Sequence, residues 1–173
     1  MPFSTLTHAD DLIAPAAARR QDGSEAFILC EFGAVCVAIA QADVVTIEHG
    51  SELSPPLPGE QVAGWFGGAG DRWPVYMLDA ELKALWSRPS GAFVVFINGS
   101  PSPVGVLCES VRIPRANSGL VVQPLPIVMR DPESAIVGIS RIDKARLAWV
   151  LCASRLAAQL NNNFSPDAQP GTQ

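Results

Sequence analysis

The sequence predicts a mostly β fold with one short helix near its carboxyl end, on three observations. Short runs of β-branched, aromatic and other apolar residues recur along the chain, which is typical of strands. Glycine and proline, present as 14 and 15 residues, separate these runs and interrupt secondary structure. A helical pattern is found only after residue 153. Many short strands separated in this way indicate small barrels or sandwiches rather than β-α-β units.

The first half of the chain predicts a hairpin and two further strands. Residues 26–32 and 34–39 are apolar runs on either side of Gly33, which can supply the turn. Residues 44–47 are β-branched and form a short strand. The segment SPPLPGE that follows favours an extended path, because proline cannot donate a hydrogen bond to a sheet. Residues 73–78 are the next expected strand.

The second half contains the strongest hairpin signal and the expected helix. The dipeptide Asn98-Gly99 favours a tight turn between two strands, although Pro101 and Pro103 delay the return strand. The expected elements are strands at residues 92–97, 104–108, 120–122, 135–139 and 147–152 and a helix at residues 154–160.

Both ends of the chain are expected to be peripheral. Residues 1–23 hold an alanine-rich stretch that is interrupted by Pro15. Residues 161–173 are polar, contain two prolines and lack periodicity, which is typical of a disordered tail. The segment between them is long enough for one domain or for two small lobes that share a core.

Charge and hydropathy exclude two classes of function. The net charge is −5, with only Lys83 and Lys144 beside ten arginines, whereas nucleic-acid binding uses a basic surface. The longest near-continuous apolar stretch, residues 34–40, is far shorter than the ~18 residues of a membrane-spanning helix. The first residues are acidic, unlike a secretory signal. We therefore expect a cytoplasmic protein that binds neither nucleic acid nor the membrane interior.

The cysteines are expected to be free. Cys30, Cys36, Cys108 and Cys152 have no CxxC spacing and lie among apolar residues. A disulfide or a metal site is the functional alternative, but thiol–metal spacing and a secretion signal are both missing. Buried thiols that behave as small hydrophobic side chains are the preferred interpretation.

No motif for catalysis or for a cofactor is found. His8 and His49 lie near no residue that would make either a catalytic base, and no GxSxG elbow marks a nucleophile. The stretch GWFGGAGDRW is not followed by a helix, so it does not fit a phosphate-binding loop, and we expect a flexible loop between strands. We expect no catalytic residue, no metal and no cofactor.

Four tryptophans offer large aromatic surfaces. Trp149 lies within an apolar strand and is expected in the core. Trp65 and Trp73 flank the glycine stretch, where they could contact a partner or close a barrel, and the sequence leaves both open.

Three segments in order resemble the CheW-like domain of bacterial chemosensory proteins. The most specific is VGVLCESV at residues 104–111, which matches the family's Val-Gly, three apolar residues, an acidic residue, a spacer and Val. Here Gly105 would allow close strand packing, and Glu109 would mark the exit to solvent. Residues 138–156 resemble the family's closing hairpin and terminal helix. Residues 56–78 resemble its Pro, Gly and Pro-Val pattern.

The chain also departs from this family. Where the family has Asn-Leu-Arg-Gly, this chain has Gly67-Gly68-Ala69-Gly70, so Ala69 replaces the basic residue and Arg72 follows three positions later. Asp79 follows Leu78 instead of preceding it, and Cys152 stands where the family often has Asp.

The resemblance covers about residues 24–160 and implies two five-stranded SH3-like barrel lobes packed over a common core, with a short C-terminal helix. It implies a non-catalytic adaptor that couples chemoreceptors to a CheA-type histidine kinase, without a cofactor. The proline content and the missing arginine are closest to divergent adaptors of pilus-type or other accessory systems. The protein-binding residues expected on this basis are Glu48, Trp65, Asp71, Arg72 and Trp73.

Two alternatives stay open. A small-molecule binder or enzyme could use the glycine stretch and its tryptophans. A degenerate adaptor could serve as a scaffold that no longer couples a kinase.

Overall fold

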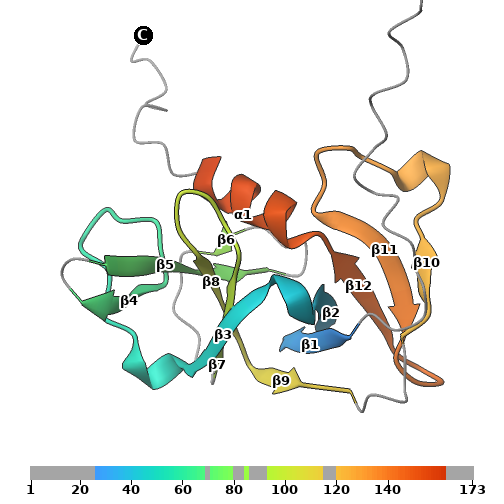
Figure 1. Cartoon of the computed structure of the whole chain (residues 1–173), viewed down its shortest axis with the longest axis horizontal. Coiled ribbons are helices and arrows are strands. Elements are labelled where there is room, and N and C mark those ends of the chain that lie inside the picture. Colours follow the sequence, from blue (N-terminus) through green and yellow to red (C-terminus); the bar gives the residue numbers. More distant parts are fainter. Residues whose placement is uncertain (1–25, 69–70, 80–83, 86–92, 115–119, 163–173) are drawn as a thin grey trace, which may run out of the picture.

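The computed structural model describes residues 26–68, 71–79, 84–85, 93–114 and 120–162. These residues form two packed β lobes and one helix (Figure 1), which confirms the mostly β prediction. The first 23 residues, His8, Ala69, Trp86 and most of the expected tail lie outside the described residues. No described helix has the length and apolar character needed to cross a membrane.

Each lobe is built on one antiparallel-rich sheet with six strands rather than the expected five. Lobe A has the order β10-β11-β12-β2-β1-β9 and contains β1 (Phe27–Phe32), β2 (Val35–Ala40), β9 (Ser110–Arg112), β10 (Val122–Pro124), β11 (Ile136–Arg141) and β12 (Leu147–Leu151). Lobe B has the order β3-β7-β8-β5-β4, with β6 paired to β5, and contains β3 (Val44–His49), β4 (Gly64–Gly68), β5 (Asp71–Leu78), β6 (Ala84–Leu85), β7 (Phe93–Ile97) and β8 (Val104–Cys108). The extra strands are short segments that pair at the margins of the sheets.

The chain leaves lobe A after β2, completes lobe B and returns to lobe A at β9. Two parallel pairings, β12 with β2 and β5 with β8, join strands that are distant in the sequence. Three 3₁₀ turns, η1 (Gln41–Asp43), η2 (Gly50–Glu52) and η3 (Ile127–Met129), and the helix α1 (Ala153–Asn162) complete the fold. The helix extends two residues into the expected tail.

The hairpin predictions at the two strongest turn signals are confirmed. Gly33 connects β1 to β2 with φ of 58°, a left-handed conformation that favours glycine. After β7, Asn98-Gly99 begins the connection to β8, and Ile97 pairs with Val104 across it. The strand expected at residues 120–122 lies slightly later, in β10.

The prediction of a loop at the glycine stretch was wrong. β4 and β5 pair directly through it, and only residues 69–70, outside the described part, separate them. Glycine disfavours strands, but the aromatic residues of this hairpin pack on lobe B and override that preference. The stretch is therefore mostly hairpin.

One apolar core lies between the lobes, as the resemblance implied. It joins Val37 and Ile39 of lobe A to Val95 and Val106 of lobe B, and α1 contributes Leu156 to it. In Figure 1 the helix lies above the junction of the lobes. Two smaller clusters are separate from this core, one in the interior of lobe A and one in the interior of lobe B.

Trp149 packs against the shared core from β12, although it is half-buried rather than fully enclosed. Its burial is therefore less complete than the sequence predicted.

Three of the cysteines are buried, as expected, and Cys152 is half-buried. Cys30 pairs with Val37 and faces the shared core, whereas Cys36 pairs with Glu31 and faces the interior of lobe A. The two thiols thus point to opposite faces of the hairpin. A hydrogen bond with Cys108, together with burial, raises the pKa of Cys30 well above its usual value and disfavours its thiolate.

We therefore expect no Cys30–Cys36 disulfide. Alkylation of the denatured, unreduced protein should modify all four cysteines, because a thiol on the opposite face cannot reach its partner without backbone movement. In the folded protein, Cys152 should react first, since it alone is partly exposed. Mass spectrometry of a linked peptide that contains both Cys30 and Cys36, from freshly lysed cells, would contradict this expectation.

Candidate functional site

The structure brings four of the five expected binding residues together. Trp65, Asp71, Arg72 and Trp73 lie on the β4–β5 hairpin, at one edge of the lobe B sheet. Glu48 lies on β3, at the opposite edge of the same sheet, where its carboxylate accepts a hydrogen bond from the hydroxyl of the nearby Thr46. A single site cannot contain all five residues.

The two tryptophans lie on opposite faces of the hairpin. Trp73 pairs across the strands with Phe66, and both rings pack on the buried Phe96 at centroid distances of 5.2 and 5.0 Å. Trp73 is therefore half-buried and packs against the interior of lobe B. Trp65 pairs with Pro74 and faces away from that cluster.

Trp65 and Arg72 form an ordered surface that we call the Trp65–Arg72 platform. The Arg72 guanidinium carbon lies 4.4 Å from the centre of the Trp65 ring, which is the geometry of a cation–π contact. The indole nitrogen of Trp65 donates a hydrogen bond of 2.7 Å to Glu60 Oε2. The same carboxylate lies 3.7 Å from Arg72 Nη2. The exposed Asp71 is adjacent to this platform.

Sequence reasoning missed Glu60, the residue that organises this platform. Glu60 also accepts a hydrogen bond of 2.8 Å from the backbone amide of Leu57, which joins the proline-rich segment to the hairpin. The hydrogen bond from Trp65, then that from Leu57, lowers the pKa of Glu60. The available signal was an acidic residue five positions before a tryptophan, which is too common to be specific.

Glu60→Ala should accelerate hydrogen exchange at the Trp65 indole and the Leu57 amide, because both donors lose their acceptor. Two-dimensional NMR would measure both exchange rates. Glu60→Gln keeps an acceptor oxygen and should retain part of the protection, and Glu52→Ala is the exposed control. Folding lowers the pKa of Glu60 from its ordinary value of 4.5. In the wild type, protection of both donors from exchange should therefore be complete above pH 4.5. It should be lost as the pH falls through the lower pKa of Glu60 in the folded protein. Equal exchange in Glu60→Ala and wild type would contradict the assignment.

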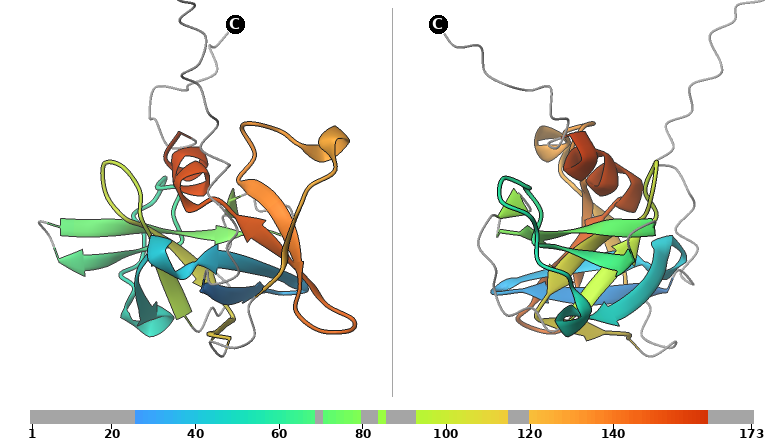
Figure 2. Two further views of the ribbon diagram at one scale, coloured as in Figure 1. Left: turned by 45° about the vertical axis from the view of Figure 1, so that its right-hand side comes forward. Right: turned by 90° about the vertical axis from the view of Figure 1, so that its left-hand side faces the viewer.

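A second candidate surface is the η3 turn, which we call the apolar turn. Ile127, Val128 and Met129 are 79%, 89% and 53% exposed. Ordinarily an apolar run of this kind is buried, and exposed apolar clusters mark binding sites. The turn stands out from lobe A between β10 and β11 (Figure 2).

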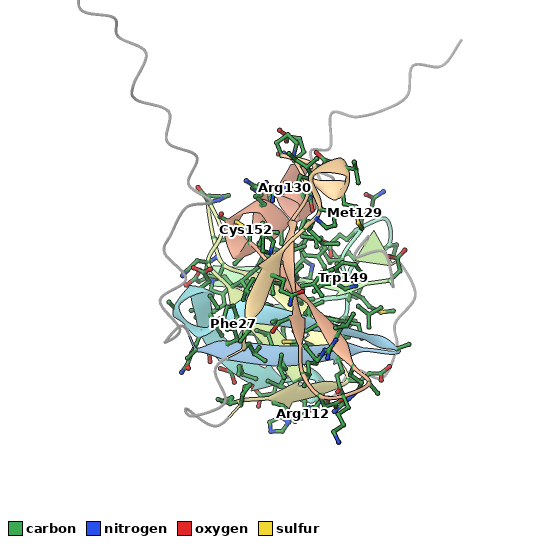
Figure 3. The ribbon with its side chains drawn as sticks, turned by 90° about the vertical axis from the view of Figure 1, so that its right-hand side faces the viewer. Phe27, Arg112, Met129, Arg130, Trp149 and Cys152 are labelled. Carbon is green, nitrogen blue, oxygen red and sulfur yellow. The ribbon has the colours of Figure 1, made fainter. Side chains whose placement is uncertain are left out.

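The apolar turn is held in place by its flanks. Leu125 is buried, and its carbonyl accepts a hydrogen bond of 2.8 Å from Arg130 Nε. The Met129 amide donates to the Pro126 carbonyl at 2.8 Å. Figure 3 labels Met129 and Arg130 beside each other at this end of lobe A. The exposed side chains therefore project from an anchored turn. The sequence signal was an apolar tripeptide between Pro126 and a charged segment.

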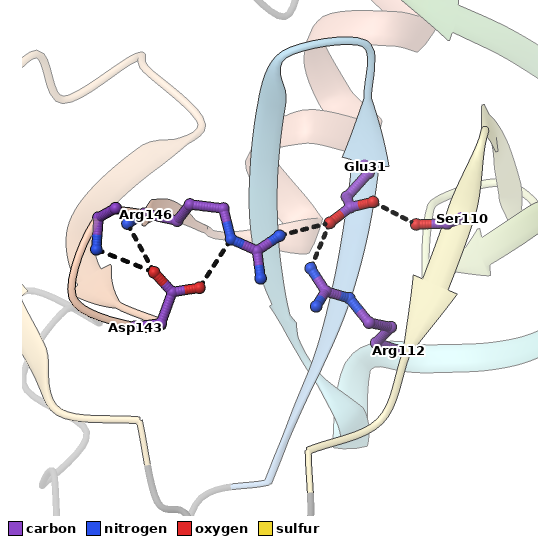
Figure 4. A network of polar contacts seen from close by, with 6 residues as sticks. Glu31, Ser110, Arg112, Asp143 and Arg146 are labelled. Atoms are coloured by element: carbon purple, nitrogen blue, oxygen red, sulfur yellow. Dashed lines mark hydrogen bonds and ion pairs between the residues drawn. The ribbon is translucent and has the colours of Figure 1, made fainter.

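A polar network lies at the other end of lobe A (Figure 4). Glu31 on β1 accepts a hydrogen bond of 2.6 Å from the Ser110 hydroxyl and forms ion pairs with Arg112 and Arg146. Arg146 also pairs with Asp143 at 2.7 Å. The hydrogen bond from Ser110, followed by the two arginines, lowers the pKa of Glu31. This network connects β1, β9 and the β11–β12 turn.

The described residues contain no group of three or more His, Cys, Asp or Glu side chains placed to hold a metal. His49 packs against Phe93, with ring centres 5.3 Å apart.

Comparisons with known proteins identify the fold. No family model matches the chain, and no curated protein matches its sequence. The crystal structure of scaffolding protein TtCheW from Thermoanaerobacter tengcongensis is similar, with a TM-score of 0.57 and 14% sequence identity. The match covers 77% of this chain and 92% of TtCheW. The two lobes, their shared core and the terminal helix of this chain thus form a divergent CheW-like fold.

Proposed function

We propose that this chain is a non-catalytic, cytoplasmic adaptor in a bacterial chemosensory system, where it couples receptors to a CheA-type histidine kinase. The observation that carries the proposal is the anchored apolar turn on a CheW-like fold. Three exposed apolar side chains on a fixed turn are typical of a surface that binds another protein.

An adaptor needs two separate surfaces, and the chain offers them. The apolar turn belongs to lobe A and the Trp65–Arg72 platform to lobe B, and they lie toward opposite ends of the molecule (Figures 1 and 2). The apolar turn suits a hydrophobic groove. The platform, with Asp71, suits a charged partner surface with an aromatic or apolar centre.

The other expected residues have supporting roles in the proposed binding of partners. Trp73 packs beneath the hairpin and holds its shape. Glu48 on the edge strand β3 is proposed as a peripheral contact. Arg72 takes over part of the role of the family arginine, which Ala69 replaces. Because of that replacement, the proposed pathway is an accessory one, such as a pilus-type system.

Two variants should separate the two surfaces. Val128→Asp should lower capture of one partner at least tenfold, because it places a charge in a desolvated contact. Arg72→Ala should lower capture of the other partner by about 1.5–3 kcal/mol, typical of a charge-assisted contact. Each variant should still bind the partner that uses the other surface. Purified CheA-type kinase and receptor signalling domain from the same cell are the partners to be tested, by calorimetry.

The control is Leu147→Asp, which changes an exposed apolar residue of lobe A outside the turn. It should bind both partners normally, and all three variants should keep nearly wild-type stability. Binding of neither partner by wild type would contradict the coupling role. Binding of the receptor alone would favour the scaffold that no longer couples a kinase.

A further inference from the structure

A cavity of about 320 Å³ opens at the end of lobe A that is opposite the apolar turn. In Figure 3, Arg112 of its rim and Met129 of the turn are labelled at opposite ends of the lobe. Among the residues that the structure describes, those that line the cavity are Leu29, Arg112, Ile113, Pro114, Leu120, Arg141 and Ile142. Strands β1, β9 and β11 meet around it, although β9 and β11 are far apart in the order of the sheet.

The inner part of the cavity is apolar. Leu29 is buried in the interior cluster of lobe A, and Leu120 and Ile142 pack against that cluster. Ile113 is 62% exposed and extends the apolar surface to the mouth. The cavity is thus the open end of the lobe A core. An apolar group that enters it would remove this surface from water.

The rim is basic. Arg112 is fixed by Glu31 through the polar network, whereas Arg141 forms no ion pair with any residue that the structure describes. Lys144 and Arg146 follow on the same β11–β12 turn. Four of the seven described lysines and arginines gather at this end, where the carboxylates of Glu31 and Asp143 offset part of their charge.

We propose that this cavity binds an amphiphilic carboxylate, with its carboxylate on Arg141 and Arg112 and a short apolar group on Leu29, Leu120 and Ile142. An arginine fork fits a carboxylate well, and Arg112 keeps further donors beside its contact with Glu31. A volume of about 320 Å³ lies at the lower end of the range of small-ligand pockets, about 300–1,000 Å³. A free short-chain acid and the carboxyl terminus of a protein that ends in an apolar residue share this chemistry.

Calorimetry and NMR titration of the full chain with octanoate test the site. Octanoate should bind saturably and shift the resonances of Leu120 and Ile142, whereas octanol and octylamine should bind at least tenfold more weakly because they lack the carboxylate. An acetylated tetrapeptide that ends in leucine, with a free or an amidated carboxyl terminus, distinguishes the two sources. Preference for the free peptide over octanoate indicates a protein terminus, and the reverse indicates a small acid.

Two matched variants test whether Arg141 binds the carboxylate. Arg141→Gln should weaken octanoate binding at least tenfold, while Lys144→Gln, which removes a charge from the same turn without lining the cavity, should change it less than twofold. Ile113→Glu should also abolish binding without unfolding the chain, since Ile113 is exposed.

Three results would overturn the proposal. The first is no saturable binding of either octanoate or the free peptide at concentrations up to about 5 mM. The second is equal binding of octanoate and octanol. The third is an equal effect of Arg141→Gln and Lys144→Gln, which would indicate general charge attraction. None of these three results depends on the proposed coupling role.

Discussion

Phe96→Ala is expected to lower the free energy of unfolding by about 3–5 kcal/mol, the largest effect of any single truncation argued from this structure. Phe96 is fully buried on β7, an internal strand of the lobe B sheet. Its ring packs on Phe66 and Trp73 of the β4–β5 hairpin. Truncation therefore removes aromatic packing on two sides and leaves a cavity in lobe B that the stiff sheet cannot close.

Denaturant unfolding followed by circular dichroism measures this effect, with Phe93→Ala as the control on the same strand. Phe93 is half-buried and packs on His49, so its truncation should cost about half as much. Because Phe96 supports the hairpin, Phe96→Ala should also weaken binding of the partner that contacts the Trp65–Arg72 platform. Equal costs for the two variants would contradict the expectation that Phe96 contributes more to stability than the half-buried Phe93.

Gly105→Ala should destabilise the fold by about 3 kcal/mol, at the upper end of the usual cost of overpacking. A methyl group at this position would lie 2.7 Å from the Phe96 ring and 2.8 Å from Val75 and from Val94. All three neighbours are buried, so none can move into solvent. Phe96 pairs with Gly105 across β7 and β8, and its ring occupies the space that a side chain would take.

Gly68→Ala is the matched control, because nothing lies within 4 Å of its added methyl group. Its unfolding free energy should stay within about 0.5 kcal/mol of wild type. If Gly105→Ala is as stable as Gly68→Ala, the glycine of the VGVLCESV segment has no packing role, and the close strand contact would have to be relaxed in solution.

The proposed adaptor role connects these packing features to binding. The Phe96 cluster holds the β4–β5 hairpin, Glu60 orients Trp65 on its outer face, and the anchored Leu125 presents the apolar turn. Each partner surface thus rests on a rigid part of a different lobe. Rigid surfaces cost less conformational entropy on binding than mobile loops do.

Much of the fold could be predicted from sequence because its signals are local. The alternation and β-branching of residues 26–47, the turn at Gly33 and the helical pattern after residue 153 depend on neighbours within a few positions. The packing role of Gly105 was also expected from its place in an apolar strand. The cost of burying polar backbone, together with these patterns, determines that the chain forms short strands and one helix.

The site could be predicted only in part. Arg72 and Trp65 were found, but their organiser Glu60 was not, and Glu48 lies at the other edge of the sheet. The apolar turn was missed because an apolar tripeptide predicts burial unless the fold leaves it outside. A sequence pattern gives the chemical character of a side chain, and exposure depends on what packs over it.

By itself, the sequence determined most of the strands, the turns at Gly33 and Asn98-Gly99, the terminal helix and the burial of Cys30, Cys36 and Cys108. Only the tertiary structure decided that β1 and β2 join β9–β12, that Trp65 and Trp73 face opposite sides, and that β11 and β9 enclose one cavity. The physical reason is that alternate side chains of a strand point to opposite faces of the sheet, and either face could become the interior. Which face becomes interior is settled by pairing with strands far away in the chain, and no local pattern encodes those partners.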